Sequence, residues 1–181
     1  MTPADSSPSS PLSGERIRQL LGALNEELRA EGVKGHVHMA GGAVMCLAFN
    51  ARESTRDVDA AFQPSVKVLE AAHRVAVKEG VRDGWLNNAV EGYLSDRATF
   101  VPLMDFRHIK VSGATAEYML AMKCLAMRLG EGFRDEEDIR YLLRNLGLRR
   151  YAAAEAILDR YYPLEDYPET ALLALRELLP E

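Results

Sequence analysis

The chain has 181 residues, a net charge of −5 at pH 7 and an isoelectric point near 5.5. This length suits one domain with a small helical appendage, and the acidic balance excludes nucleic-acid binding through a global basic field. Apolar residues make up 48% of the chain, enough for a hydrophobic core, but no apolar run approaches the roughly 20 residues of a membrane span.

The N-terminal segment, residues 1–12, consists mainly of Ser, Pro, Thr and Ala and is predicted to form a disordered tail. It lacks the basic and apolar regions of a signal peptide, so we expect a cytoplasmic protein. Cys46 and Cys124 stand alone in apolar helical patterns, which is typical of buried, reduced thiols.

The first half of the chain is predicted to alternate helix and strand. The expected helices are 14–31, 43–49 and 66–79, and the expected strands are 35–39 and 57–62. Ser13 is expected to cap the first helix. In the third helix, Val66, Leu69 and His73 are predicted to share the inner face with Ala72 and Ala76.

The second half of the chain becomes mostly helical. Residues 81–91 are predicted to form a loop anchored by Trp85, and strand material follows at 99–101 and 103–111, interrupted at Pro102. The expected helices are 116–129, 135–146, 151–161 and 169–179. We therefore predict an α+β (α/β) fold, with a tail at 1–12, a mixed-sheet core with flanking helices at 13–112 and a helical C-terminal part at 113–181.

The most informative stretch joins a Gly41-Gly42 turn to the sequence Asp57-Val58-Asp59. In a strand, the two-residue period puts both carboxylates on one face. Two neighbouring carboxylates repel each other, so the pair favours a bound cation such as Mg²⁺, which commonly bridges to substrate phosphates. Glycines let the backbone approach a ligand closely, so the pattern indicates nucleotide chemistry.

This pattern, with Thr55-Arg56 leading the acids, resembles the nucleotidyltransferase fold superfamily, in particular the abortive-infection and toxin-type nucleotidyltransferases of bacteria. Those proteins also carry a later Lys on an apolar helix, followed by an Asp-rich helix start. Here Lys123 and the segment 134–138 match these features. The resemblance covers roughly residues 36–146 and implies a nucleotidyltransferase-like sheet.

The resemblance also implies roles for individual residues. Asp57 and Asp59 would hold two Mg²⁺ ions, and Gly41 and Gly42 would cradle the triphosphate of an NTP substrate. Arg56 would contact phosphate.

Three further residues enter through the family pattern. Asp105 lies between large apolar neighbours in a predicted strand, and in this it resembles the third carboxylate that many members use as general base. Asp138, or less favourably Asp135, is the alternative acid, although acids in a first helical turn also complement the helix dipole. Lys123 would neutralise the triphosphate, unless its stem simply covers apolar surface.

The function implied is transfer of a nucleoside monophosphate from NTP to a macromolecular hydroxyl, on RNA such as a tRNA end or on a protein. As a toxin–antitoxin or phage-defence component, such a protein would have a cognate antitoxin. Two alternatives stay open: an antibiotic-modifying nucleotidyltransferase acting on small molecules, and a non-catalytic module that binds a nucleotide or a partner.

Overall fold

The computed structural model describes residues 10–127 and 134–180, and it confirms the mixed α+β fold. Within these residues, five strands form one sheet in the order β5-β4-β2-β7-β6. Their bounds are Gly35–Ala40 (β2), Val58–Gln63 (β4), Leu86–Asn87 (β5), Phe100–Asp105 (β6) and Ile109–Ala114 (β7). Strand β2 runs antiparallel to β4 and parallel to β7.

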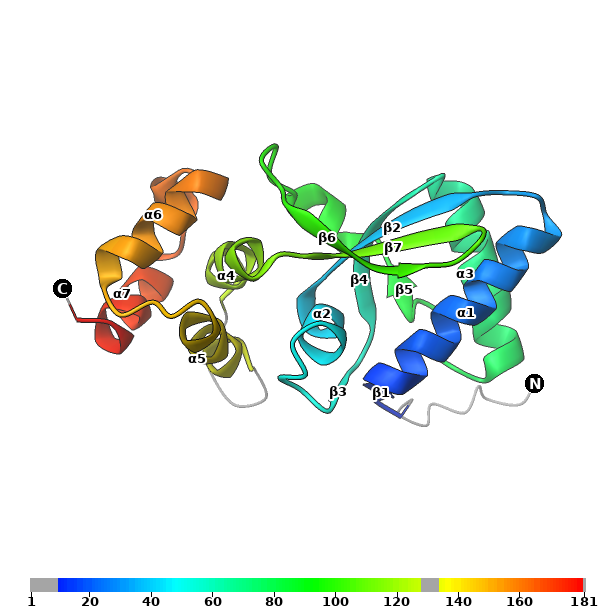
Figure 1. The fold of residues 1–181 in the computed structure, drawn as a ribbon, viewed down its shortest axis with the longest axis horizontal. Helices are drawn as coiled ribbons and strands as arrows, with labels where there is room; N and C mark the ends of the chain where they lie inside the picture. Colours follow the sequence, from blue (N-terminus) through cyan, green and yellow to red (C-terminus); the bar gives the residue numbers. More distant parts are fainter. Residues whose placement is uncertain (1–9, 128–133, 181) are drawn as a thin grey trace, which may run out of the picture.

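One face of this sheet packs on the helices α1 (Gly14–Ala30) and α3 (Ser65–Glu79), which lie together beside the strands (Figure 1). A Cβ atom at Gly35 would touch Leu28 of α1 and Val68 of α3, so alternate residues along β2, such as Val37 and Met39, are buried on this side. The opposite face carries the other residues of each strand, including Asp59.

Regular secondary structure begins earlier in the N-terminal region than predicted. Leu12 and Ser13 form the short strand β1, which pairs antiparallel with β3 (Ser54–Thr55), so the predicted tail 1–12 overlaps a strand; its residues 1–9 lie outside the described part. The Ser13 cap is confirmed, since its hydroxyl accepts a hydrogen bond from the Arg16 amide.

The inner face of α3 differs from the predicted one. Val66 and Leu69 are exposed, at 67% and 39%, and His73 is exposed as well. The predicted Ala72 and Ala76 are buried, together with Val68, Ala71 and Val75. The Trp85 anchor is confirmed, because its buried indole donates a hydrogen bond to the Ala72 carbonyl.

The strands β6 and β7 form an antiparallel hairpin, with a bulge between Pro102 and Met104. The two strands are therefore separated by residues 106–108, whereas Pro102, the predicted interruption, lies within β6. Strand β6 lies at the edge of the sheet, where a residue without an N–H donor is tolerated.

The C-terminal helices gather at one end of the sheet (Figure 1). They are α4 (Ala116–Leu125), α5 (Asp135–Asn145), α6 (Tyr151–Tyr161) and α7 (Glu169–Leu178). Short 3₁₀ turns lie between β5 and β6, at Ala89–Tyr93 (η1), and between α6 and α7, at Leu164–Asp166 (η2). Helix α4 packs against α5, α6 and α7. The last residues of the predicted helix 116–129 lie outside the described part. No helix of the described ranges is long and apolar enough to cross a bilayer.

Candidate functional site

Gly41 and Asp59 lie in direct contact where β2 ends. Ala40, the last residue of β2, pairs with Asp59 of β4, and Gly41 then turns the chain with φ +65°. A Cβ atom at Gly41 would lie only 2.8 Å from Asp59 Oδ2. Both the positive φ and the proximity of the carboxylate therefore require glycine here.

Gly42 is enclosed in the same way by the loop that follows α2 (Gly41–Leu47). A Cβ atom there would lie 2.5 Å from Thr55 Oγ1 and 3.1 Å from Arg52 Nη1. The two glycines therefore allow residues 52–59 to pack against the end of β2. This contact brings the Gly41-Gly42 turn next to Asp59.

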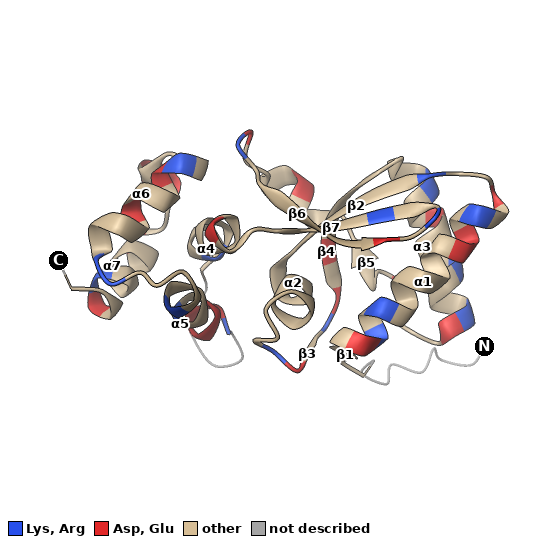
Figure 2. Cartoon of the chain, in the orientation of Figure 1, with Lys and Arg blue, Asp and Glu red and all other residues tan. Residues whose placement is uncertain are grey.

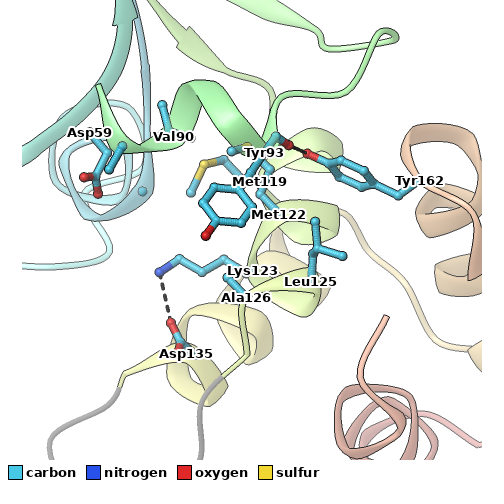
Figure 3. Close-up of a pocket in the computed structure, with 12 residues that line it drawn as sticks. Asp59, Val90, Tyr93, Met119, Met122, Lys123, Leu125, Ala126, Asp135 and Tyr162 are labelled. Carbon is cyan, nitrogen blue, oxygen red and sulfur yellow. Dashed lines mark hydrogen bonds and ion pairs between the residues drawn. The ribbon is translucent and has the colours of Figure 1, made fainter. Parts of the chain in front are cut away.

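Asp59 and Gly41 form one wall of a pocket with a volume of about 280 Å³ (Figure 3). The pocket lies between the end of the sheet, η1, α4 and the start of α5. Its ionisable side chains, Asp59, Lys123 and Asp135, gather at one end in Figure 3. The remainder is largely apolar and aromatic, lined by Ala89, Val90, Tyr93, Met119, Met122, Leu125, Ala126 and Tyr162.

The aromatic end is held by hydrogen bonds among tyrosines. The Tyr162 hydroxyl donates to the Tyr93 carbonyl at 2.6 Å and lies 3.2 Å from the Tyr118 hydroxyl. Burial raises the pKa of Tyr162, so this hydroxyl keeps its proton and remains a donor. The pocket thus combines charged and aromatic side chains, and the Tyr93 ring, which is 65% exposed, lies beside Lys123 (Figure 3).

Lys123 belongs to a buried ionic cluster. Its Nζ lies 2.8 Å from Asp138 Oδ2 and 3.3 Å from Asp135 Oδ1, and Arg52 binds Asp138 through two nitrogens, with Nε at 2.8 Å. The four side chains are only 3–14% exposed. Within the described residues, these pairs connect the loop after α2 to helices α4 and α5.

Arg52 was not singled out from the sequence. It stands in a polar loop, 86 residues before its partner, so no local pattern marks it. The one available signal was indirect, because a buried acid such as Asp138 requires a cation to balance it.

Asp57 and Arg56 lie outside the Asp59 pocket. Asp57 directly precedes β4, and its carboxylate accepts a hydrogen bond from Arg82 at 3.1 Å. Arg56 is exposed and lines a second pocket. The structure therefore brings Gly41, Gly42, Asp59, Lys123, Asp135 and Asp138 together, and places Asp57 and Arg56 beside them.

Asp105 lies elsewhere on the sheet. It ends β6 and pairs with Lys110, at the opposite end of β7 from the pocket. Three strand spacings, roughly 14 Å, separate β6 from β4. The structure thus does not bring Asp105 to Asp59, and Asp135 is the second carboxylate of the pocket.

The side chains at the pocket fit a Mg²⁺ ion that arrives with phosphate ligands. Within the described ranges, no group of three or more His, Cys, Asp or Glu side chains could hold a metal by itself. Mg²⁺ commonly uses one or two carboxylates and takes its other ligands from water and substrate phosphates. Asp59 can supply such a carboxylate.

Comparisons of the chain with protein-family models, curated proteins and solved structures give no match. A functional assignment therefore depends on the motif residues and on the geometry of the pocket.

Proposed function

We propose that the protein is a Mg²⁺-dependent nucleotidyltransferase that uses NTP as its substrate. The observation that supports this most is the contact between Asp59 and Gly41 in a pocket that is also lined by Lys123 and by aromatic side chains. A triphosphate fits beside Asp59 and Lys123. A base fits against Tyr93, whose ring faces into the pocket (Figure 3), and stacking on an aromatic ring is typical of base recognition.

The charges around the pocket favour a nucleotide bound together with its cation. Lys123 and Asp135 line the pocket, and so does the carboxylate of Asp59. A bare triphosphate would be repelled by that carboxylate. Asp59 would hold the Mg²⁺, and the metal would stabilise the charge that builds on the phosphates.

In the reaction, an acceptor hydroxyl oxygen forms a bond to the α-phosphorus of the NTP. The bond from that phosphorus to the bridging oxygen of the β-phosphate breaks, and pyrophosphate leaves. Asp135, which lines the pocket, would take the proton of the hydroxyl. Lys123 would neutralise the triphosphate as a point charge.

The acceptor in this proposal is a hydroxyl of a macromolecule, either RNA such as tRNA or a protein. The setting would be a cytoplasmic toxin–antitoxin or phage-defence system, with an antitoxin as partner. This part of the proposal follows from the resemblance of the motif residues to the toxin-type proteins.

The proposal is tested by incubating the protein with α-labelled NTPs, Mg²⁺ and total RNA or cell protein. We expect label transfer by the wild type, and loss of about 100-fold or more in Asp59→Asn, which keeps the side-chain shape but removes the charge. Asp105→Asn is the matched control and should retain wild-type transfer. Transfer that survives Asp59→Asn, or is lost equally in both variants, contradicts the assignment.

A second candidate is a nucleotide-binding module without turnover. It is favoured by the ion pair between Asp57 and Arg82, which occupies one of the two acids that the motif supplies. Calorimetric NTP binding without pyrophosphate release, with every acceptor supplied, would favour this candidate over the enzyme.

A further inference from the structure

A second pocket, here named the arginine pocket, shares no lining residue with the Asp59 pocket. Its volume is about 240 Å³. Three of its lining side chains, Arg16, Arg56 and Arg82, are cationic, and none is acidic.

The fold assembles this pocket from three distant segments. The pairing of β1 with β3 places the start of α1, with Arg16, beside the segment that carries Arg56. Arg82 follows the end of α3, and its carbonyl accepts a hydrogen bond from the Trp85 amide at 3.1 Å. The Trp85 carbonyl in turn binds the Val58 amide, so the turn is fixed to β4.

The arginines are only partly neutralised. Arg16 binds the Glu79 carboxylate at 3.0 Å and the Glu79 carbonyl at 2.8 Å, and Arg82 binds Asp57 at 3.1 Å. Arg56 makes no ion pair with any residue of 10–127 or 134–180 that the structure records. Three cations therefore face two acids, and Arg56 offers the five N–H donors of its guanidinium to a ligand.

This local excess of positive charge is opposite in sign to the net charge of the chain, which is −5. Acidic and basic segments alternate along α1 in the view of Figure 2. A guanidinium recognises phosphate through paired N–H donors. The arginine pocket is thus suited to one phosphate group and not to general nucleic-acid binding.

We infer that the arginine pocket binds a backbone phosphate of an RNA acceptor. Its role as an acceptor site rests on the proposed function. Arg56 and Asp59 are three residues apart, so their Cα atoms are at most roughly 10 Å apart. The arginine pocket is lined from α1 and the end of α3, and Asp59 lies on the other face of the sheet, so an RNA strand that reaches both pockets would pass around the start of β4. A protein acceptor carries no obligatory phosphate, and the pocket therefore favours RNA over protein.

The test measures binding of a fluorescein-labelled single-stranded RNA to the full-length protein by anisotropy, without NTP and at several salt concentrations. Arg56→Glu should weaken binding about tenfold and lower the slope of log affinity against log salt by about one. Arg149→Glu is the matched control, since it makes the same charge change at an exposed site on the loop between α5 and α6. It should stay close to wild type.

Equal weakening by the two substitutions, or no RNA binding by the wild type, would overturn the inference. So would an Arg56→Glu variant that loses affinity for Mg²⁺-NTP while keeping its affinity for RNA. Asp59→Asn separates this inference from the proposed function, because it should abolish NTP binding and leave RNA affinity unchanged. RNA binding by a protein that transfers no nucleotide would support the phosphate site and reject the enzyme.

Discussion

At the scale of single residues, the contact between Gly41 and Asp59 defines the pocket. The glycine has no Cβ, so the Asp59 carboxylate can lie against the backbone at the end of β2. A larger residue would have to displace the carboxylate, because β-sheet pairing with Ala40 fixes the Asp59 backbone.

The substitution Gly41→Ala should therefore destabilise the protein and weaken Mg²⁺-NTP binding together. Gly147→Ala is the control, since Gly147 has the same φ of +65° but nothing within 4 Å of its Cβ position. The control should lose about 1 kcal/mol of unfolding free energy from backbone strain alone. Urea denaturation and calorimetry measure both effects, and equal losses with unchanged NTP affinity would contradict the account.

Some of these residues could be predicted from the sequence and some could not. The order of Gly41-Gly42, Asp59 and Lys123 predicted residues that the structure brings together. Arg52 was missed because its partner Asp138 lies on a separate helix. Asp105 fits the local pattern of an acid between large apolar neighbours in a strand, but only strand order and register show that it lies far from Asp59.

At the scale of elements, the ionic cluster of Arg52, Lys123, Asp135 and Asp138 connects the loop after α2 with α4 and α5. Its side chains are almost fully removed from water. Removing one partner of such a cluster leaves a buried charge uncompensated, which costs much more than the loss of an exposed pair.

We predict that Asp138→Ala lowers the free energy of unfolding by about 3 kcal/mol or more. Glu136→Ala, which removes the exposed pair with Arg140 on the same helix, should cost at most about 0.5 kcal/mol. Urea denaturation gives both values. Similar losses in the two variants would show that the cluster is not shielded from solvent.

The positions of the helices and strands could largely be predicted from the sequence, but the buried face of a helix could be predicted less well. Helical spacing in α3 offers two apolar stripes, and the larger residues Val66 and Leu69 suggested the wrong one. The structure buries the predicted Ala72 and Ala76 on a stripe that also contains Val68 and Ala71, because small residues let α3 approach α1 and let the Trp85 indole reach the Ala72 carbonyl. Such a choice depends on packing partners that one helix does not reveal.

At the scale of the whole molecule, α4 lies between the sheet and the other C-terminal helices (Figure 1). Cys124 of α4 is buried at this junction, and burial raises the pKa of its thiol from 9.0 to about 12. Burial also raises the pKa of Tyr162 and of Tyr167. Deprotonation of these groups therefore opposes folding.

This burial predicts a loss of stability in alkali. A thiol whose pKa is raised by folding contributes fully below pH 9, and its contribution falls as the pH rises from 9 towards 12. Between pH 8 and pH 10, wild-type unfolding free energy should fall by about 1 kcal/mol more than that of Cys124→Ala. Urea denaturation at both pH values measures the difference, and parallel decreases would contradict the burial of this thiol.

The central claim is that the pocket between the sheet and α4 holds a nucleotide with its triphosphate at Asp59. A crystal structure with a non-hydrolysable NTP analogue and Mg²⁺ tests this most directly. We predict triphosphate density beside Asp59 and Lys123 and the base against Tyr93. Density for the analogue at another site, or an unchanged pocket under saturating analogue and Mg²⁺, would contradict the claim.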